Sequence, residues 1–230
     1  MTREIYDGYR REVLSASLWL SEHGYFGSQR GTGGNVSVRV DGEQAMAITP
    51  SSARYQDLSA GDICIVGFDL ALIEAGGALK PSMESGMHSA IYRSRPDVNA
   101  VVHTHQTYAS VLAVLAEPIP ALFDEVSFAL GQAVEVIPYA LSGSHELAAN
   151  VEGKVGSNAN AYLIQNHGAL ALGRTLEKAL YHAELLEKLS HVYCLALSTG
   201  RAVHTLPEPT VEMARALRDN EVGEAARKKG

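Results

Sequence analysis

The stretch that decides the fold runs from Pro81 to Tyr108 and reads PSMESGMHSAIYRSRPDVNAVVHTHQTY. Near its end, the segment Ala100–His103 is apolar and β-branched and follows a Pro-Asp pair, which predicts a buried strand. Side chains two positions apart on a strand point to the same face. We therefore expect His103 and His105 to project together, with the threonine between them turned away.

The same stretch predicts a helix that begins at Glu84. Pro81 and Ser82 are typical of a helix start, and Met87 and Ile91 mark an apolar stripe along one face. Glu84 then stands at a helix end, from which its carboxylate can face the end of the neighbouring strand.

A third imidazole lies far downstream, at His167 in the segment Gln165–Gly168. It follows the apolar run Ala161–Ile164, which predicts a second strand with His167 at its exit. Three imidazoles and a carboxylate are a ligand set that grips a zinc ion and leaves room for a substrate oxygen. The predicted metal ligands are Glu84, His103, His105 and His167.

The remaining histidines are interpreted as packed or solvated side chains, namely His23, His145, His182, His191 and His204. His88 is an intermediate case, because it lies one helical turn from Glu84 on the same helix face. A metal site alone does not identify a reaction, and a closed, purely structural site stays open at this point.

From about Ile5 to about Leu197 the chain resembles the class II aldolase and adducin head-domain family, whose enzymes act on L-fuculose 1-phosphate, L-rhamnulose 1-phosphate and L-ribulose 5-phosphate. The fuculose-phosphate aldolase-like enzymes are the most similar branch, since the epimerases carry aspartate where this chain has Glu84. The segments that carry the resemblance occur in family order: Gly33–Arg39, Ile48–Ser52, Lys80–Glu84, His103–His105, Ile137–Tyr139, Gly143–Leu147 and Gln165–Gly168.

The resemblance implies an α/β fold: a three-layer α/β/α domain with a central, mostly antiparallel, nine-stranded sheet. The residues agree, because short turns between adjacent strands favour antiparallel pairing with helices covering the sheet. We expect one domain over residues 1–230 and, by resemblance, a homotetramer with sites between subunits. Two interpretations stay open for the polar tail from about residue 207: a short helix docked on a neighbour, or a mobile segment.

The resemblance also assigns roles at the site. It implies zinc held by the three histidines, with Glu84 as ligand or catalytic base. The residues matched to phosphate binding are Gly34, Asn35, Ser51, Ser52 and Ser82. Two departures matter: Met83 stands where these aldolases have a second serine, and Ser52 stands where glycine is common. Met83 leaves open whether the substrate carries a phosphate.

The proton donor is a further departure. Fuculose-phosphate aldolases place a tyrosine after an Ile-Pro segment, whereas here Ile119–Phe123 leads into Asp124 and Glu125. Either acid can exchange a proton if its pKa suits, and we expect the pair to complete the pocket of a neighbouring subunit. The alternative is an acidic N-cap on a helix that runs from Val126 towards Leu130.

The expected reaction is a zinc-dependent retro-aldol cleavage of a small, L-fuculose-1-phosphate-like ketose phosphate, which gives dihydroxyacetone phosphate and an aldehyde. Manganese or cobalt suits the same ligands. Three related reactions on a sugar phosphate stay open: decarboxylation, 4-epimerisation and dehydration. A non-catalytic binding domain like the adducin head is an alternative from a different class.

Composition and charge limit the number of domains and the classes of partner that this chain can have. The chain has 230 residues, 46% of them hydrophobic, which is enough for one full core, and a net charge of −7. Basic residues cluster only at Arg227–Lys229, so we expect no nucleic-acid partner. The polar start and the lack of a long apolar run predict a cytoplasmic protein without a membrane partner. Cys64 and Cys194 are interpreted as buried thiols.

Overall fold

The computed structural model describes residues 2–28, 30–156 and 159–229. Its centre is one eight-stranded sheet in the order β4-β3-β2-β1-β5-β8-β7-β6. All neighbouring strands pair antiparallel except β6 and β7, which are parallel. The strands are β1 (Asn35–Arg39), β2 (Ala45–Ile48), β3 (Cys64–Gly67), β4 (Leu72–Glu74), β5 (Ala100–Thr104), β6 (Glu135–Ile137), β7 (Ala161–Ile164) and β8 (Gly168–Gly173).

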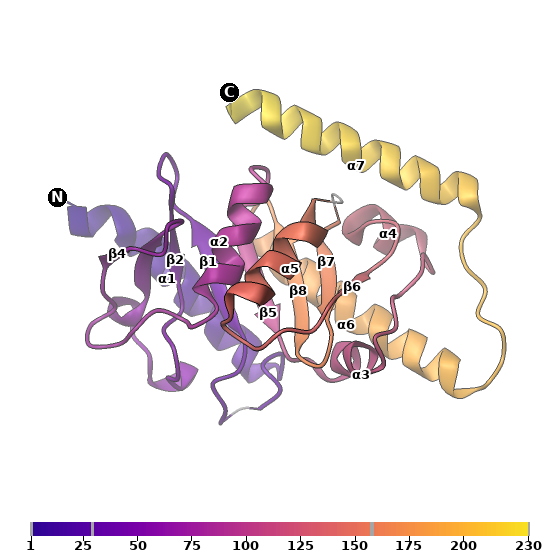
Figure 1. The fold of residues 1–230 in the computed structure, drawn as a ribbon, viewed down its shortest axis with the longest axis horizontal. Helices are drawn as coiled ribbons and strands as arrows, with labels where there is room; N and C mark the ends of the chain where they lie inside the picture. The colour runs from indigo at the N-terminus through magenta and orange to yellow at the C-terminus, as the bar shows by residue number, and fades with distance from the viewer. Residues whose placement is uncertain (1, 29, 157–158, 230) are drawn as a thin grey trace.

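Helices cover both faces of this sheet (Figure 1). Helices α2 and α5 pack on one face, and α1 and α6 pack on the other, where α3 and α4 extend the layer. The helices are α1 (Thr2–Glu22), α2 (Ser85–Ser94), α3 (Thr107–Leu115), α4 (Asp124–Leu130), α5 (His145–Val155), α6 (Leu176–Ser198) and α7 (Glu208–Lys229). Two short 3-10 turns, Tyr55–Asp57 and Ala60–Asp62, lie between β2 and β3.

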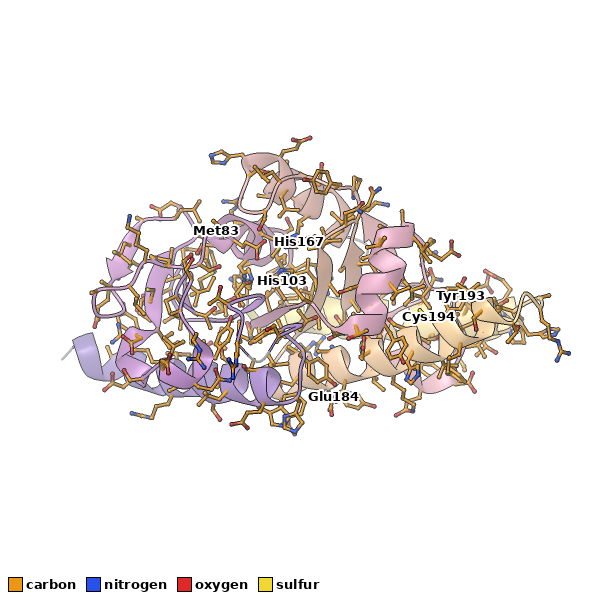
Figure 2. The ribbon with its side chains drawn as sticks, turned by 90° about the horizontal axis from the view of Figure 1, so that it is seen from below. Met83, His103, His167, Glu184, Tyr193 and Cys194 are labelled. Atoms are coloured by element: carbon orange, nitrogen blue, oxygen red, sulfur yellow. The ribbon has the colours of Figure 1, made fainter. Side chains whose placement is uncertain are left out.

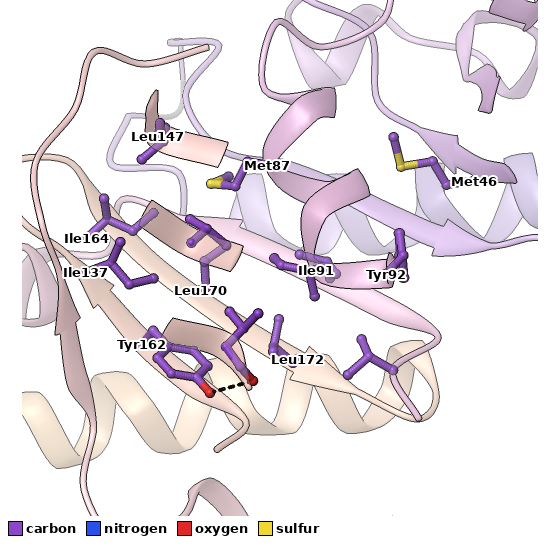
Figure 3. Packing of buried hydrophobic residues seen from close by; sticks show 14 of the residues in the cluster. Met46, Met87, Ile91, Tyr92, Ile137, Leu147, Tyr162, Ile164, Leu170 and Leu172 are labelled. Carbon is purple, nitrogen blue, oxygen red and sulfur yellow. Dashed lines mark hydrogen bonds between the residues drawn. The ribbon is translucent and has the colours of Figure 1, made fainter. Parts of the chain in front are cut away.

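Alternate side chains along each strand point to opposite faces of the sheet and pack in the hydrophobic cores on those two faces. In β8, Leu170 and Leu172 belong to the core under α2 and α5, while Ala169 and Ala171 belong to the cores on the opposite face. Figure 3 shows the first of these cores, where Ile91 of α2 packs close to the β8 leucines. Because both faces are covered, the central strands β5, β7 and β8 consist largely of buried apolar residues, and the polar residues His103 and Thr104 come at the end of β5.

The pairing of β5 positions the site. β5 lies between β1 and β8 and is antiparallel to both, with Asn35 opposite His103 and His103 opposite Leu170. The end of β5 therefore lies beside the starts of β1 and β8. Residues before Asn35, after Thr104 and before Gly168 meet at one end of the sheet.

The three-layer, mostly antiparallel α/β fold is confirmed, with eight strands rather than nine. The sequence pattern gave no indication of β4, because it is a three-residue edge strand whose Leu72 and Ile73 are exposed. The helix predicted from Val126 begins at Asp124, with both acids in its first turn.

The tail that follows Pro207 is helical over most of its length. It forms one long helix, α7, that packs on α4 of its own chain, where Ala214 and Arg218 are buried. Arg218 donates hydrogen bonds to the Ala129 carbonyl at 2.9 Å and to Asn160 Oδ1 at 2.7 Å. Cys64 is buried as expected, whereas Cys194 is only partly buried, and both are free thiols. Among the described residues, no helix combines the length and apolarity that a bilayer span requires.

Candidate metal centre

Three imidazoles meet at the end of the sheet. One ring nitrogen from each of His103, His105 and His167 lies within 4.8 Å of the other two. The Nε2 atoms of His103 and His105 are 3.0 Å apart. Figure 2 shows His103 and His167 together near the middle of the molecule. Residues separated by more than sixty positions in the chain thus converge as the sequence predicts.

Backbone geometry brings His167 to the pair on β5. The turn from β7 to β8 passes through Asn166, whose φ of 54° is left-handed, a conformation that asparagine tolerates. Gly168 then packs directly on β5, since a Cβ there would lie 2.3 Å from the Thr104 carbonyl oxygen and 2.7 Å from His105 Cδ2. Only glycine allows this approach.

Glu84 lies at the N-terminal end of α2 and touches two of the imidazoles. Its Oε2 is 3.2 Å from His103 Nε2, and its Oε1 is 3.2 Å from His167 Nε2. Both oxygens also accept hydrogen bonds of 2.7 Å, from Asn35 Nδ2 and from Ser142 Oγ. Burial pushes the pKa of Glu84 upward, but the His103 and His167 interactions outweigh burial and hold it below its usual range. The carboxylate is therefore ionised and fixed at both oxygens.

Hydrogen bonds and burial set the orientation and the pKa values of the imidazoles in this cluster. His103 Nδ1 donates to the Ala169 carbonyl at 2.9 Å, which leaves Nε2 free to bind an ion. Burial opposes charging of His103, but Glu84 outweighs burial and raises the His103 pKa. Burial, together with the charges of His103 and His167, lowers the pKa of His105 to about 3. The ligand set suits a divalent cation, because imidazole nitrogens and one carboxylate oxygen are the donors that zinc sites use.

A cavity of about 140 Å³ opens beside this cluster. It is lined by the imidazole and carboxylate residues His105, His167 and Glu84, and by Thr32, Gly33, Gly34, Asn35, Pro50, Ser51, Ser52, Ser82, Met83 and Ser142. All five residues matched to phosphate binding are among them. The hydroxyls and the glycine-rich backbone offer hydrogen-bond donors to an anion.

Two positions in this lining have left-handed backbone. Gly34 has a φ of +69°, and a Cβ there would lie 2.2 Å from the Phe26 ring, so glycine is required. Ser52 has a φ of 58°, a left-handed conformation that glycine adopts without strain and other residues adopt rarely. Met83 lies at the rim and is 64% exposed, so it leaves the cavity open.

Asp124 and Glu125 are not brought to this cavity within the chain. They lie in the first turn of α4, where Glu125 Oε1 accepts a hydrogen bond of 2.9 Å from Tyr181 on α6. The Asn35 side chain lines the cavity, but both ends of its amide are engaged, one with Glu84 and one with His88.

Sequence reasoning missed Ser142. It lies in the loop between β6 and α5 and donates to Glu84. The only indication was the glycine next to it: Gly143 has a φ of +75°, and a Cβ there would lie 3.0 Å from the Met83 carbonyl oxygen. This close approach holds the loop against the start of α2.

Comparisons with known proteins agree with this arrangement. A family model described as the class II aldolase and adducin N-terminal domain matches residues 11–194. An L-fuculose phosphate aldolase from Escherichia coli O6:H1 is 35% identical over 87% of this chain and 89% of its own length. A 5-deoxy-D-ribulose 1-phosphate aldolase from Bacillus thuringiensis serovar kurstaki is 37% identical over 91% of this chain and 92% of its own length.

A solved L-fuculose 1-phosphate aldolase superposes with a TM-score of 0.83 at 34% identity, over 91% of this chain and 95% of the other. The family match covers most of the chain, and the two relatives described above are named as aldolases of sugar phosphates. The chain is an enzyme that belongs to the class II aldolase and adducin N-terminal domain family, on its aldolase branch.

Proposed function

We propose that the protein is a zinc-dependent aldolase that cleaves a short ketose 1-phosphate, of the L-fuculose 1-phosphate or 5-deoxyribulose 1-phosphate kind, into dihydroxyacetone phosphate and an aldehyde. The single observation that carries the proposal is the convergence of three imidazoles and Glu84 beside a cavity lined by glycine backbone and serine hydroxyls. The relatives named for these two substrates support the substrate class.

His103, His105 and His167 would hold the zinc ion, with Glu84 as a fourth ligand when no substrate is bound. A bound zinc ion supplies Lewis acidity toward a carbonyl oxygen. Manganese or cobalt would supply the same chemistry at these ligands.

The serine and glycine residues would hold the substrate phosphate. Gly34, Ser51, Ser52 and Ser82 line the cavity together with Asn35. Because the Asn35 amide is engaged with Glu84 and His88, the hydroxyls and backbone N–H groups are the donors assigned to the phosphate. With Met83 in place of a second serine, this cradle has one hydroxyl fewer.

Proton transfer requires two groups. When the bond between C3 and C4 of the ketose breaks, the C4 hydroxyl loses a proton and C3 gains one. Glu84, a buried residue in the lining of the cavity, is assigned the proton at C3. The proton of the C4 hydroxyl is assigned to Asp124 and Glu125 of a neighbouring copy in a homotetramer. The exposed apolar side chains of α3 and α6, including Val111, Val114 and Leu195, support an interface there.

The substrate test is a screen of ketose 1-phosphates with enzymatic detection of dihydroxyacetone phosphate. The proposal expects triose phosphate in equal amount to the aldehyde, loss of turnover after chelation, and recovery when zinc is returned. Released carbon dioxide or an isomerised sugar as the sole product would instead identify a decarboxylase or an epimerase.

The role of the neighbouring copy has its own test. His105→Ala and Glu125→Gln proteins are prepared separately, then mixed, dissociated and reassembled. If Glu125 acts across an interface, mixed oligomers regain part of the wild-type activity, because some sites receive both intact residues. Mixtures that stay inactive, or a protein that sediments as a monomer, would refute the shared site.

A further inference from the structure

A buried chain of polar side chains runs from Glu84 into the core beneath the cavity. Asn35 Nδ2 donates to Glu84 Oε2 at 2.7 Å, and Asn35 Oδ1 contacts His88 Nε2. On the other side of the ring, His88 Nδ1 lies 2.6 Å from Ser37 Oγ, which lies 2.8 Å from Tyr92 OH. All five side chains are buried, and His88 is completely shielded from solvent.

The direction of each hydrogen bond in this chain can be worked out. An ionised carboxylate only accepts, so the NH2 group of Asn35 faces Glu84 and the amide oxygen faces His88. The amide oxygen also only accepts, so His88 Nε2 carries the proton. In the neutral ring Nδ1 is then an acceptor, and Ser37 Oγ donates to it. Tyr92 OH in turn donates to Ser37 Oγ.

His88 stays neutral under ordinary conditions. Burial, with a smaller contribution from the charge of His103, lowers the pKa of His88 to about 3. The ring therefore stays neutral, and its contacts with Ser37 and Asn35 determine which ring nitrogen carries the proton. Each donor in the chain points toward Glu84, which accepts the last hydrogen bond.

A flipped Asn35 amide would place its oxygen against the Glu84 carboxylate and its NH2 group against the N–H of His88. Both contacts are repulsive. We propose that His88 is a positioning residue: held by Ser37 in the Nε2-protonated form, it keeps the Asn35 amide turned so that its NH2 group fixes Glu84. The proposal deepens the proposed function, because it depends on Glu84 serving as a metal ligand at this site.

The chain offers a matched control in His182. This histidine is also buried and neutral in the fold, because burial lowers its pKa to about 4. Its Nδ1 donates to the Leu172 carbonyl at 2.6 Å, and it lies on α6, on the opposite face of the sheet from Glu84 on α2. Replacing His182 therefore costs a comparable buried hydrogen bond without touching Asn35 or Glu84.

The first test reads the tautomer directly in the wild-type protein. Nitrogen-15 NMR of histidine-labelled, zinc-loaded enzyme, with the His88 signals assigned by their loss in His88→Gln, reports which ring nitrogen carries the proton. We expect Nε2 to be protonated and Nδ1 unprotonated from pH 6 to 8. A proton on Nδ1 would overturn the proposal, since Asn35 would then be free to turn.

The second test measures zinc affinity by competition with a chromophoric chelator, without any substrate. His88→Leu is expected to weaken zinc binding about 10- to 100-fold, the usual effect of losing a group that orients a ligand. His88→Gln should restore most of the loss, because its amide nitrogen replaces the Nε2 donor. His182→Leu should leave zinc affinity unchanged. Equal losses in His88→Leu and His182→Leu would show a general effect on stability and overturn the proposal.

A double-mutant comparison asks whether His88 acts through Asn35. In an Asn35→Ala background, His88→Leu should weaken zinc binding no further; an additive loss would contradict the proposed route. If a leucine variant fails to fold, the tautomer measurement and His88→Gln still decide the question. Both readouts are independent of turnover, so an enzyme that binds zinc as expected but cleaves no ketose phosphate would refute the proposed function and leave this inference intact.

Discussion

Close approach of backbone at single residues decides how near the imidazoles come to one another. Gly168 lies between the carbonyl oxygen of Thr104 and the ring of His105, with no room for a methyl group. Gly34 has the same constraint, because a Cβ there would meet the Phe26 ring at 2.2 Å and the His103 carbonyl oxygen at 2.7 Å. The site is thus defined by residues that carry no functional group, as well as by its ligands.

Replacing Gly168 by alanine is expected to push His105 out of the cluster. The added Cβ would stand 2.3 Å from the Thr104 oxygen, so the turn or the ring must move. We expect zinc content to fall well below one ion per chain, measured by inductively coupled plasma mass spectrometry. The matched control is Gly153→Ala in α5, where a Cβ meets nothing within 4 Å. That control should keep its zinc and gain about 0.5–1 kcal/mol of stability. A Gly168→Ala protein with full zinc content would refute this account of the turn.

At the scale of elements, three strand ends and one helix end build the site. The start of β1, the end of β5 and the start of β8 lie at the same end of the sheet, and α2 begins beside them, directly after Glu84. Helix α6 supports β8 from behind, where His182 donates to the Leu172 carbonyl. This bond stabilises the packing of α6 on the sheet near the C-terminal end of β8, away from the end where His167 lies.

The contact between α6 and β8 should weaken in mild acid. Burial, with contributions from Arg218 and Lys178, lowers the folded-state pKa of His182 to about 4, against about 6.5 in the unfolded chain. Between these values the unfolded state binds the extra proton, so stability falls as pH drops from 6.5 to 4, by at most about 1.4 kcal/mol per pH unit. His182→Gln should remove that part of the slope in urea unfolding followed at a series of pH values. Identical slopes for the two proteins would show that His182 is not the responsible group.

At the scale of the whole molecule, the aldolase fold is joined to a long C-terminal helix. The family match ends at residue 194, whereas α7 begins at Glu208 and returns to pack on α4. Arg218 fixes it by bonding the Ala129 carbonyl and Asn160 Oδ1. Helix α7 therefore packs on the same helix, α4, that carries Asp124 and Glu125 in its first turn. Its packing affects the position of the two acids that are proposed to serve a neighbouring copy.

Replacing Arg218 by alanine is expected to loosen α7 without unfolding the sheet. Hydrogen exchange should speed up across residues 208–220, by roughly 10-fold or more for hydrogen bonds of about 1.5–3 kcal/mol, and stay unchanged in β5 and β8. Arg215→Ala is the control, since Arg215 is 67% exposed and pairs only loosely, at 3.8 Å, with Asp219. Equal exchange in both variants would mean that Arg218 does not hold the helix.

Much of the site could be predicted from sequence because it follows local periodicity. Strand alternation places His103 and His105 on one side, and an apolar run ending before His167 marks another strand exit. What escaped prediction depends on contacts between distant segments. Ser142 has no pattern of its own, and its role arises because Gly143 lets its loop approach Met83.

The hydrogen-bond partners of the buried polar side chains could not be predicted from the sequence either. Nothing in the sequence indicates that Asn35 lies between Glu84 and His88, because this contact needs β1 and α2 to pack together. The full length of α7 was not predicted, because its sequence is polar and carries only scattered apolar residues, so the apolar stripe that identifies a helix is weak. Its helical state is supported by packing on α4.

The central claim is that His103, His105 and His167 bind one divalent cation that faces the cavity. Zinc K-edge X-ray absorption on the purified enzyme tests this claim most directly. We predict one zinc per chain with three imidazole nitrogens at about 2.0–2.1 Å and one or two oxygens at similar distance, with the imidazole scattering reduced in His167→Ala. Sulfur neighbours at about 2.3 Å, or a spectrum that His167→Ala leaves unchanged, would contradict it.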